Sequence, residues 1–427
     1  EKDLPVLQAI TTYLTTYNRY MNLLGIPVVL GLAYLLSNNR RKINVRLVIS
    51  ALIMQVILAF VVIRTEIGRS TISFLADAAN ALYLSATDGI TFLFGNLANP
   101  SGPWGFVFAF NVLPIIVFFG AFMALLFHFG IIQRAVSLVR IVIQPLFGTS
   151  GAETLCAISN SFLGQTEAPL LIRHYLDGMT KSELFVVMVS GMGTLSGAIL
   201  LVYASMGVPV SHLLGASIMA IPATILLAKI MLPETGKPKT LASGTISMKS
   251  PSKNMLDAIS TGTSDGLQLA LNVGAMLIAF IALLALGDSI VVGLQNLFYW
   301  LFSFSVHPPV YHLKDIFAVL FLPFGYLLGF TGNEAWIASK LIGIKVIINE
   351  MVAYSQLVKE QVSPRALTLL TYVLCGFSNL SCIGIQIGGI GALVPSKRAW
   401  LSELGLRAVV AATLANFLSA LVVGLIT

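Results

Sequence analysis

The residues best suited to chemistry lie together in one apolar stretch, NSFLGQTEAPLLIR, which runs from Asn160 to Arg173. It places Gln165, Thr166 and Glu167 side by side, so an amide, a hydroxyl and a carboxylate follow one another among hydrophobic residues. A charged carboxylate inside a bilayer costs about 2.5–3.5 kcal/mol on insertion scales, and an intramembrane Glu therefore indicates a functional site. The alternative is a short loop outside the bilayer that carries an ordinary surface Glu.

The local pattern predicts a helical hairpin with this carboxylate at its tip. Gly164 permits a sharp turn after a first helix that ends within 159–163. Thr166 is a suitable N-cap for a second helix, and Pro169 lies in the first turn of that helix, where a missing N–H costs nothing. Each arm has about a dozen residues, too few to span a bilayer, so we expect a re-entrant hairpin over 151–175.

The composition places most of the chain in lipid. Of its 427 residues, 57% are hydrophobic and only 10% are charged, against about 25% charged in an ordinary soluble domain. The net charge of +7 is weak support for a nucleic-acid partner, because inner loops of membrane proteins carry the same excess of Lys and Arg. The three cysteines contain no CxxC pair and predict neither a disulfide framework nor a zinc site. The acidic, weakly apolar start EKDLPVLQAI predicts no cleavable signal peptide.

The positions of the apolar runs predict an all-α polytopic membrane protein with eight transmembrane helices, two re-entrant hairpins and interfacial helices. The eight spans are expected at 21–36, 48–63, 105–130, 184–206, 211–232, 266–287, 366–387 and 404–426. Interfacial helices are expected at 65–97, 131–147 and 314–328, a polar loop at 233–253, and an outer connection at 288–311.

The two halves of the chain repeat one order of elements: an interfacial helix, a hairpin with Glu at its tip, a broken span and an intact span. The second hairpin is expected at 333–357. Glu167 precedes Thr194 by 27 residues, and Glu350 precedes Asn379 by 29. Matching interruptions in two halves point to a transporter site at the bilayer midplane. The bias of basic residues towards the expected inner loops favours an inverted repeat, with the hairpins entering from opposite sides.

The hairpin tips and broken spans bring together amide, hydroxyl and carboxylate groups, a mixture that suits a neutral ligand with many donors and acceptors. These groups belong to Gln165, Thr166, Glu167, Thr194, Ser196, Glu350, Ser378, Asn379 and Ser381. Phe377 and Ile199 could supply an apolar wall for a ring, and helix ends offer carbonyls to a cation. The chain has no HExxH and no P-loop signature. An intramembrane enzyme with a carboxylate pair remains the alternative from another class, and a channel is disfavoured because broken helices favour an occluded site.

Three motifs resemble the concentrative nucleoside transporters: GQTEAPLLIR, the later NE and VAY at 349–350 and 352–354, and GFSNLSCIGIQIGGIG at 376–391. The order of elements agrees with the family from about residue 20 to the end. The resemblance implies sodium-driven uptake of nucleosides across a bacterial inner membrane, without nucleic acid as a partner. It also implies a homotrimer in which each protomer has its own site and a transport domain that moves as an elevator. A proton-coupled nucleoside or nucleobase transporter is the alternative.

The resemblance also assigns parts of the chain and individual residues. Scaffold helices would occupy 1–130, the first repeat of the transport domain 131–232, a loop and scaffold helix 233–312, and the second repeat 313–427. Substrate would meet Gln165, Thr166 and Glu167 at the base, Ile199 and Phe377 on its flanks, and Glu350 and Asn379 at the ribose. Sodium would bind Asn160, Leu163, Thr194 and Leu195, the two leucines through their backbone carbonyls. Cys382 stands where the family commonly has Ser, a stronger hydrogen-bonding group, at a second ribose contact.

Overall fold

The computed structural model describes residues 4–99, 101–240, 252–302 and 310–427. These residues form α-helices joined by short turns and 3-10 helices, with no strand among them, which confirms the predicted all-α class. Residues 241–251 of the expected polar loop and 303–309 of the expected outer connection lie outside the described part.

The helices follow the expected order along the chain. In the first half they are α1 (Leu4–Thr15), α2 (Arg19–Leu35), α3 (Val45–Arg64), α4 (Glu66–Phe94), α5 (Phe108–Asn111), α6 (Leu113–His128), α7 (Ile131–Phe147), α8 (Gly151–Ser159), α9 (Ala168–Leu171), α10 (Arg173–Leu176), α11 (Lys181–Gly193), α12 (Gly197–Ser205) and α13 (Val210–Met231). In the second half they are α14 (Met255–Leu301), α15 (Leu313–Leu327), α16 (Gly332–Ile347), α17 (Glu350–Leu357), α18 (Pro364–Leu374), α19 (Ser381–Leu393) and α20 (Arg398–Ile426). The 3-10 helices are η1 (Thr16–Asn18), η2 (Arg40–Lys42), η3 (Gly95–Ala98) and η4 (Pro395–Lys397).

The helices long and apolar enough to cross a membrane are fewer than the eight expected spans. Among the described residues there are six, or seven if α15 and α16, which meet at 117°, form one span. Two of the expected spans are short or interrupted: α2 has 17 residues, and the seventh expected span, at 366–387, is divided into α18 and α19. The polytopic helical fold is therefore confirmed, with six or seven helical spans among the described residues.

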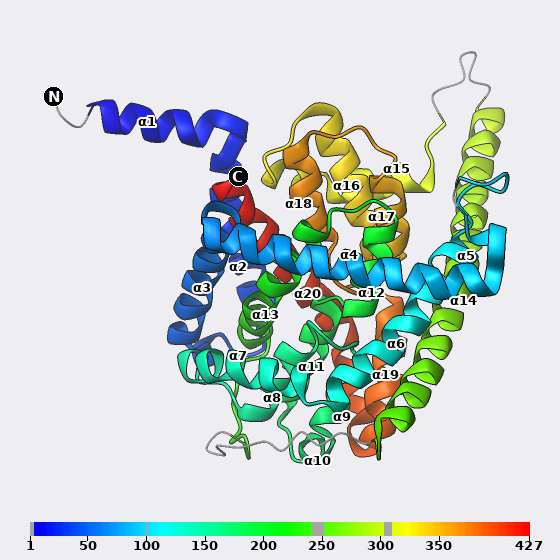
Figure 1. The fold of residues 1–427 in the computed structure, drawn as a ribbon. Coiled ribbons are helices and arrows are strands. Elements are labelled where there is room, and N and C mark those ends of the chain that lie inside the picture. The colour runs from blue at the N-terminus through cyan, green and yellow to red at the C-terminus, as the bar shows by residue number, and fades with distance from the viewer. Residues whose placement is uncertain (1–3, 100, 241–251, 303–309) are drawn as a thin grey trace.

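The burial of the helices separates a central group from a peripheral one. The most apolar window is 94% buried in α11–α12 and 89% in α13, but only 22% in α3 and 6% in α14. Helix α20 packs against α2, α11, α13 and α18, which places it at the centre of the molecule. Figure 1 shows α4 lying across this bundle and α14 running along its edge beside α6.

The two hairpins lie at opposite ends of the molecule, as an inverted repeat requires. Figure 1 shows α8, α9 and α10, which we name hairpin 1, at the lower end, and α16 and α17, which we name hairpin 2, at the upper end. Both breaks expected in the spans are present, between α11 and α12 and between α18 and α19.

Side-chain caps start the helices that surround these breaks. Ser150 and Glu153 form a capping box before α8, and Thr180 and Glu183 form another before α11. At hairpin 2, the Asn349 side chain accepts a 2.9 Å hydrogen bond from the Val352 N–H and so begins α17 directly at Glu350. These residue types satisfy the unpaired N–H groups of a first turn, which explains why the helices begin where they do.

Two local expectations are wrong. The second arm of hairpin 1 is two four-residue helices rather than one helix, because its hydrogen bonds close three-residue turns, as from the Ile172 N–H to Pro169 O at 3.1 Å. Its N-cap is Glu167, not Thr166, although Pro169 does lie in the first turn.

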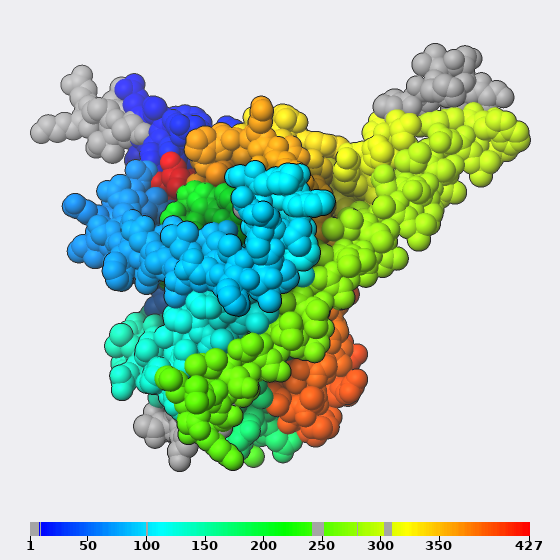
Figure 2. Space-filling view, turned by 45° about the vertical axis from the view of Figure 1, so that its right-hand side comes forward, coloured from blue at the N-terminus to red at the C-terminus, as the bar shows by residue number. Residues whose placement is uncertain are grey.

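The expected outer connection at 288–311 is also wrong in its first part, because α14 continues to Leu301. No proline interrupts 288–301, and Asp288 is held at the helix surface by the Leu313 N–H, which donates to its carboxylate at 2.8 Å. With 47 residues, α14 is about 70 Å long, more than twice the hydrocarbon thickness of about 30 Å. Figure 2 shows its C-terminal part projecting from the body of the molecule.

Helices α6 and α14 pack so closely that only glycine fits at their contact. A Cβ atom on Gly262 would lie 2.5 Å from Gly120 O and 2.6 Å from the Ala124 Cβ, and one on Gly120 would lie 2.4 Å from Gly262 O. Small residues allow membrane helices to approach closely where no hydrophobic effect drives them together. The pair α6–α14 is therefore joined by backbone contact.

We predict that Gly262→Ala lowers the midpoint of thermal unfolding, since forcing a methyl group into this contact costs about 1–3 kcal/mol. Gly293→Ala is the matched control on the same helix, because no atom lies within 4 Å of its Cβ position. Fluorescence-detected size exclusion after heating would measure both variants in detergent. Equal midpoints for the two would contradict the packing described here.

Candidate functional site

The centre of the candidate site is the carboxylate of Glu350, at the first position of α17. Its side chain is 5% exposed. One carboxylate oxygen accepts a 2.8 Å hydrogen bond from the Tyr203 hydroxyl of α12, and the other accepts a 2.9 Å bond from the Asn379 amide. Glu350 therefore links hairpin 2 to the broken helices of both halves.

The Asn379 side chain continues this network into the break between α18 and α19. Its Oδ1 accepts hydrogen bonds from the Ser381 hydroxyl at 2.6 Å and from the Cys382 N–H at 3.1 Å. The backbone N–H of Asn379 donates to Phe377 O at 2.8 Å. These bonds hold the irregular segment in a fixed turn, with the Asn379 amide directed at Glu350.

The network reaches hairpin 1 through Cys382 and Gln165. The Gln165 amide lies 3.3 Å from the Cys382 sulfur, and its Oε1 accepts a 3.1 Å hydrogen bond from Gln386 on α19. The Gln386 amide also donates to Met188 O of α11 at 3.0 Å. A continuous path of polar contacts thus joins the two hairpin tips through both broken helices.

Tyr203 and Gln386 are members of this network that the sequence analysis missed. Tyr203 is fully buried, and its ring packs against Tyr354 with 4.5 Å between the ring centroids. A signal was present in each case, because both are polar residues within the second, apolar half of a broken span. Only the three-dimensional contact with Glu350 or Gln165 shows which role they take.

The other expected substrate residues lie close to these elements. Thr166 packs against α19 so tightly that a Cβ on Gly389 would lie 2.7 Å from the Thr166 methyl carbon. Ile199 is buried in the first turn of α12, and Phe377 is half-buried in the break of α18 and α19.

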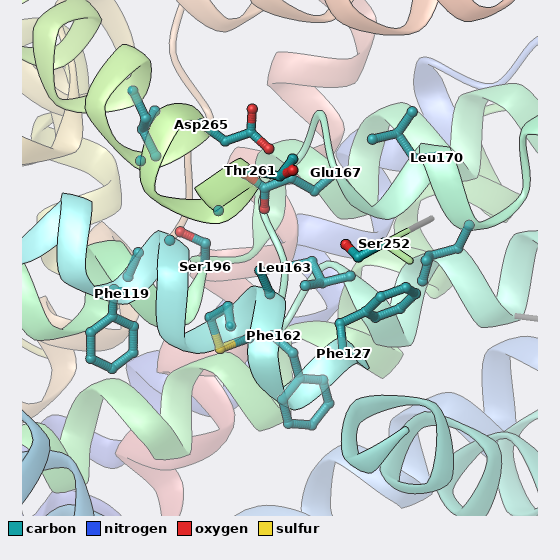
Figure 3. Close-up of a pocket in the computed structure, with 18 of the residues that line it drawn as sticks. Phe119, Phe127, Phe162, Leu163, Glu167, Leu170, Ser196, Ser252, Thr261 and Asp265 are labelled. Carbon is teal, nitrogen blue, oxygen red and sulfur yellow. The ribbon is translucent and has the colours of Figure 1, made fainter. Parts of the chain in front are cut away.

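Glu167, unlike Gln165 and Glu350, makes no hydrogen bond to the polar network within the described residues and lies at the wall of a cavity. Its carboxylate accepts a hydrogen bond from the Gly164 N–H and so closes the turn of hairpin 1. It also lines a cavity of about 670 Å³ together with Leu163, Ser196 and Asp265. Figure 3 shows Glu167 of hairpin 1 and Asp265 of α14 at the wall of this cavity. The structure therefore places Glu167, at the tip of hairpin 1, on the side that faces the peripheral helix α14.

Asn160 and Thr194, two of the residues expected to bind sodium, are in contact. The Thr194 hydroxyl lies 3.1 Å from Asn160 O and 2.8 Å from Ser190 O, and the Asn160 amide donates to the Ser190 hydroxyl at 3.0 Å. Asn160 Oδ1 is buried and has no hydrogen-bond partner within the described residues. Leaving such an oxygen unpaired costs about 1–3 kcal/mol, so its surroundings fit a bound cation.

The break after α11 also contacts hairpin 1, close to Asn160 and Thr194. The Gly197 N–H donates a 3.1 Å hydrogen bond to Phe162 O, which ties the start of α12 to the turn of the hairpin. Leu163 and Leu195, whose carbonyls are the other expected ligands, flank these two segments in the sequence and are both buried. The expected ion residues thus lie where hairpin 1 meets the break.

Family models match the chain in three consecutive parts. Residues 24–97 match the N-terminus of the Na+ dependent nucleoside transporters, 109–210 match a nucleoside recognition (Gate) domain, and 212–424 match the C-terminus of the Na+ dependent nucleoside transporters.

Relatives match over nearly the whole chain. An uncharacterized transporter of Haemophilus influenzae is 42% identical over 95% of this chain and 97% of its own. The nucleoside permease NupC of Helicobacter pylori is 38% identical over 96% of this chain and 98% of its own. The solved structure of CNTnw in an inward-facing, substrate-bound state has a TM-score of 0.88 and 38% identity, and it covers 95% of this chain and 98% of that one.

These matches cover the hairpins, both breaks and every residue of the polar network. The chain belongs to the family of sodium-dependent, concentrative nucleoside transporters, and its family is one of transporters rather than enzymes.

Proposed function

We propose that this protein is a symporter that takes up nucleosides across the bacterial inner membrane, driven by the sodium gradient. The observation that carries this proposal is the buried carboxylate of Glu350, bonded to both Tyr203 and Asn379. An ionised carboxylate accepts about four hydrogen bonds, so it can take those of two neighbouring ribose hydroxyls while it keeps both protein partners. Asn379 would contribute to the same subsite.

The base would lie between the two hairpin tips. Gln165 and Thr166 would offer an amide and a hydroxyl to the edge of the base. Glu167 would be the third residue of hairpin 1 that contacts the base. Ile199 and Phe377 would flank the ring, and Cys382, in contact with Gln165, would lie between base and ribose. The solved relative that holds substrate and the relative that is a nucleoside permease support this class of ligand.

The coupling ion would bind at Asn160 and Thr194, with the carbonyls of Leu163 and Leu195. The unpaired Asn160 Oδ1 supports this site, and unwound backbone at helix breaks commonly coordinates sodium in transporters. A proton-coupled nucleoside transporter is the second candidate, with the Glu167 carboxylate as the group that would carry the proton. The cavity shared by Glu167 and Asp265 is the observation that favours it.

Elevator movement would carry the two repeats, 131–232 and 313–427, past the scaffold. The scaffold would comprise 1–130 and 233–312, and its helices α2 and α3 contact α20 and α13 of the transport domain. The exposed apolar side chains of Leu294, Leu297 and Leu301 on α14 support contact with further copies, and we propose a homotrimer.

We predict that proteoliposomes with the purified protein accumulate radiolabelled uridine when sodium is present outside. Accumulation should stop when choline replaces sodium, and a protonophore should leave it unchanged, because the energy comes from the sodium gradient. Recovery of unaltered uridine excludes enzymatic conversion. Uptake that survives in choline and collapses with the protonophore would make the proton the coupling ion.

We predict that Glu350→Gln keeps the protein folded and weakens uridine binding about tenfold or more, since each charge-assisted hydrogen bond contributes about 1.5–3 kcal/mol. Glu360→Gln is the matched control, because Glu360 pairs with Lys340 at 2.6 Å and is 28% exposed. Calorimetric titration with uridine would compare the two variants. Wild-type affinity in a folded Glu350→Gln protein would remove Glu350 from the site.

A further inference from the structure

Helix α16 carries a buried lysine that the proposed binding of nucleoside and sodium does not use. The Lys345 side chain is 1% exposed. Its ammonium donates to Val373 O at 2.8 Å, to Asn416 Oδ1 at 2.9 Å and to Cys375 O at 3.4 Å. These three acceptors are uncharged oxygens, and they match the three N–H donors of an ammonium group. Lys345 is thus coordinated as a bound cation would be.

The acceptors lie at a helix end that attracts positive charge. Helix α18 ends at Leu374, so Val373 O and Cys375 O belong to the group of terminal carbonyls that have no partner within the helix. The negative end of the helix dipole adds to their attraction for a cation. Discontinuous helices of transporters place coupling ions at ends of this kind.

Among the residues that the structure describes, no such lysine contacts the corresponding break in the first half. There the Thr194 hydroxyl donates to the backbone carbonyl of Asn160, and Asn160 Oδ1 has no donor within the described residues. One break therefore presents an unpaired buried oxygen, whereas the oxygens of the other break accept hydrogen bonds from an ammonium group on a side chain.

Asn416 of α20 joins the two breaks. Its Oδ1 accepts from Lys345 and, at 3.3 Å, from the Ser378 hydroxyl, and its amide donates to Gly193 O at 2.7 Å. Gly376 has φ +107°, and a Cβ there would lie 2.7 Å from Gly193 O, so the two chain segments touch. The ammonium consequently holds the segment that carries Phe377 and Asn379.

We propose that Lys345 is a tethered cation that fills the ion position at the break of α18, and that it positions Asn379 and Phe377 for the substrate. The effect on substrate rests on the proposed function, whereas the filled cation position does not. Removing the side chain beyond Cβ would expose three oxygens to a free monovalent cation. Methylammonium, which has the charge and the donors of the lost group, is the closest substitute.

The test compares Lys345→Ala with wild type in choline buffer, with and without methylammonium chloride. We expect Lys345→Ala to weaken uridine binding about tenfold or more and methylammonium to restore most of this loss. Methylammonium should also raise the thermal unfolding midpoint of Lys345→Ala, measured without nucleoside, and leave wild type unchanged. A role in packing alone would not respond to a free amine.

Two variants serve as controls. Lys345→Met keeps most of the stem and fills the space, so it should bind uridine as weakly as Lys345→Ala and gain nothing from the amine. Lys340→Ala, on the same helix, removes a lysine that pairs with Glu360 at 2.6 Å, and should bind uridine normally with or without amine.

Two results would overturn the proposal. One is that Lys345→Ala or Lys345→Met binds uridine with wild-type affinity. The other is that Lys345→Ala binds uridine weakly and methylammonium does not improve this binding. If Lys345→Ala can be purified only with methylammonium present, the proposal is supported; if it cannot be purified at all, the affinity of Lys345→Met decides. A wild-type protein that binds no nucleoside would refute the proposed function, and the amine-dependent unfolding of Lys345→Ala would still test the cation position.

Discussion

The structure depends on one constraint: a helix that stops inside a membrane leaves backbone groups unpaired, and there is no water to satisfy them. Each break in this chain meets the constraint with groups from elsewhere in the sequence. The Asn416 amide donates a hydrogen bond to the carbonyl of Gly193 at the end of α11, and the Lys345 ammonium donates to carbonyls at the end of α18. Hairpins, breaks and α20 must therefore fold as one body, which agrees with the deep burial of α11–α13.

The same constraint concentrates the chemistry of the molecule. Polar groups occur at the breaks because unpaired backbone groups there need partners, and those with spare hydrogen-bonding capacity are the candidates for binding a ligand. Glu350 retains lone pairs after bonding Tyr203 and Asn379, and Asn160 Oδ1 has no protein partner within the described residues. The first fits the hydroxyls of a nucleoside and the second fits a cation. Both proposed sites adjoin the breaks that Asn416 links, so we expect that a ligand bound at one changes the affinity of the other.

Much of this architecture could be predicted from sequence because its signals are local. Glycine and polar residues within apolar runs mark both breaks, and the Asn349–Glu350 pair marks the start of α17. The roles of Tyr203, Gln386 and Lys345 could not be predicted, because each depends on a partner far away in the chain. The length of α14 was missed because Asp288 follows directly after an apolar run and resembles the end of a span. A helix that leaves the bilayer can nevertheless continue past such a residue, as α14 does. Thr166 resembled an N-cap, but the Glu167 carboxylate takes the Gly164 N–H that closes this turn.

If the proposed nucleoside and ion sites share the broken helices, binding at the two sites must be coupled. Binding linkage tests it most directly: the uridine dissociation constant with and without saturating sodium, and the sodium dissociation constant with and without saturating uridine. We predict that each ligand lowers the dissociation constant of the other by the same factor, as equilibrium linkage demands, and that Thr194→Ala reduces this factor. Uridine affinity that does not change between sodium and choline would contradict it.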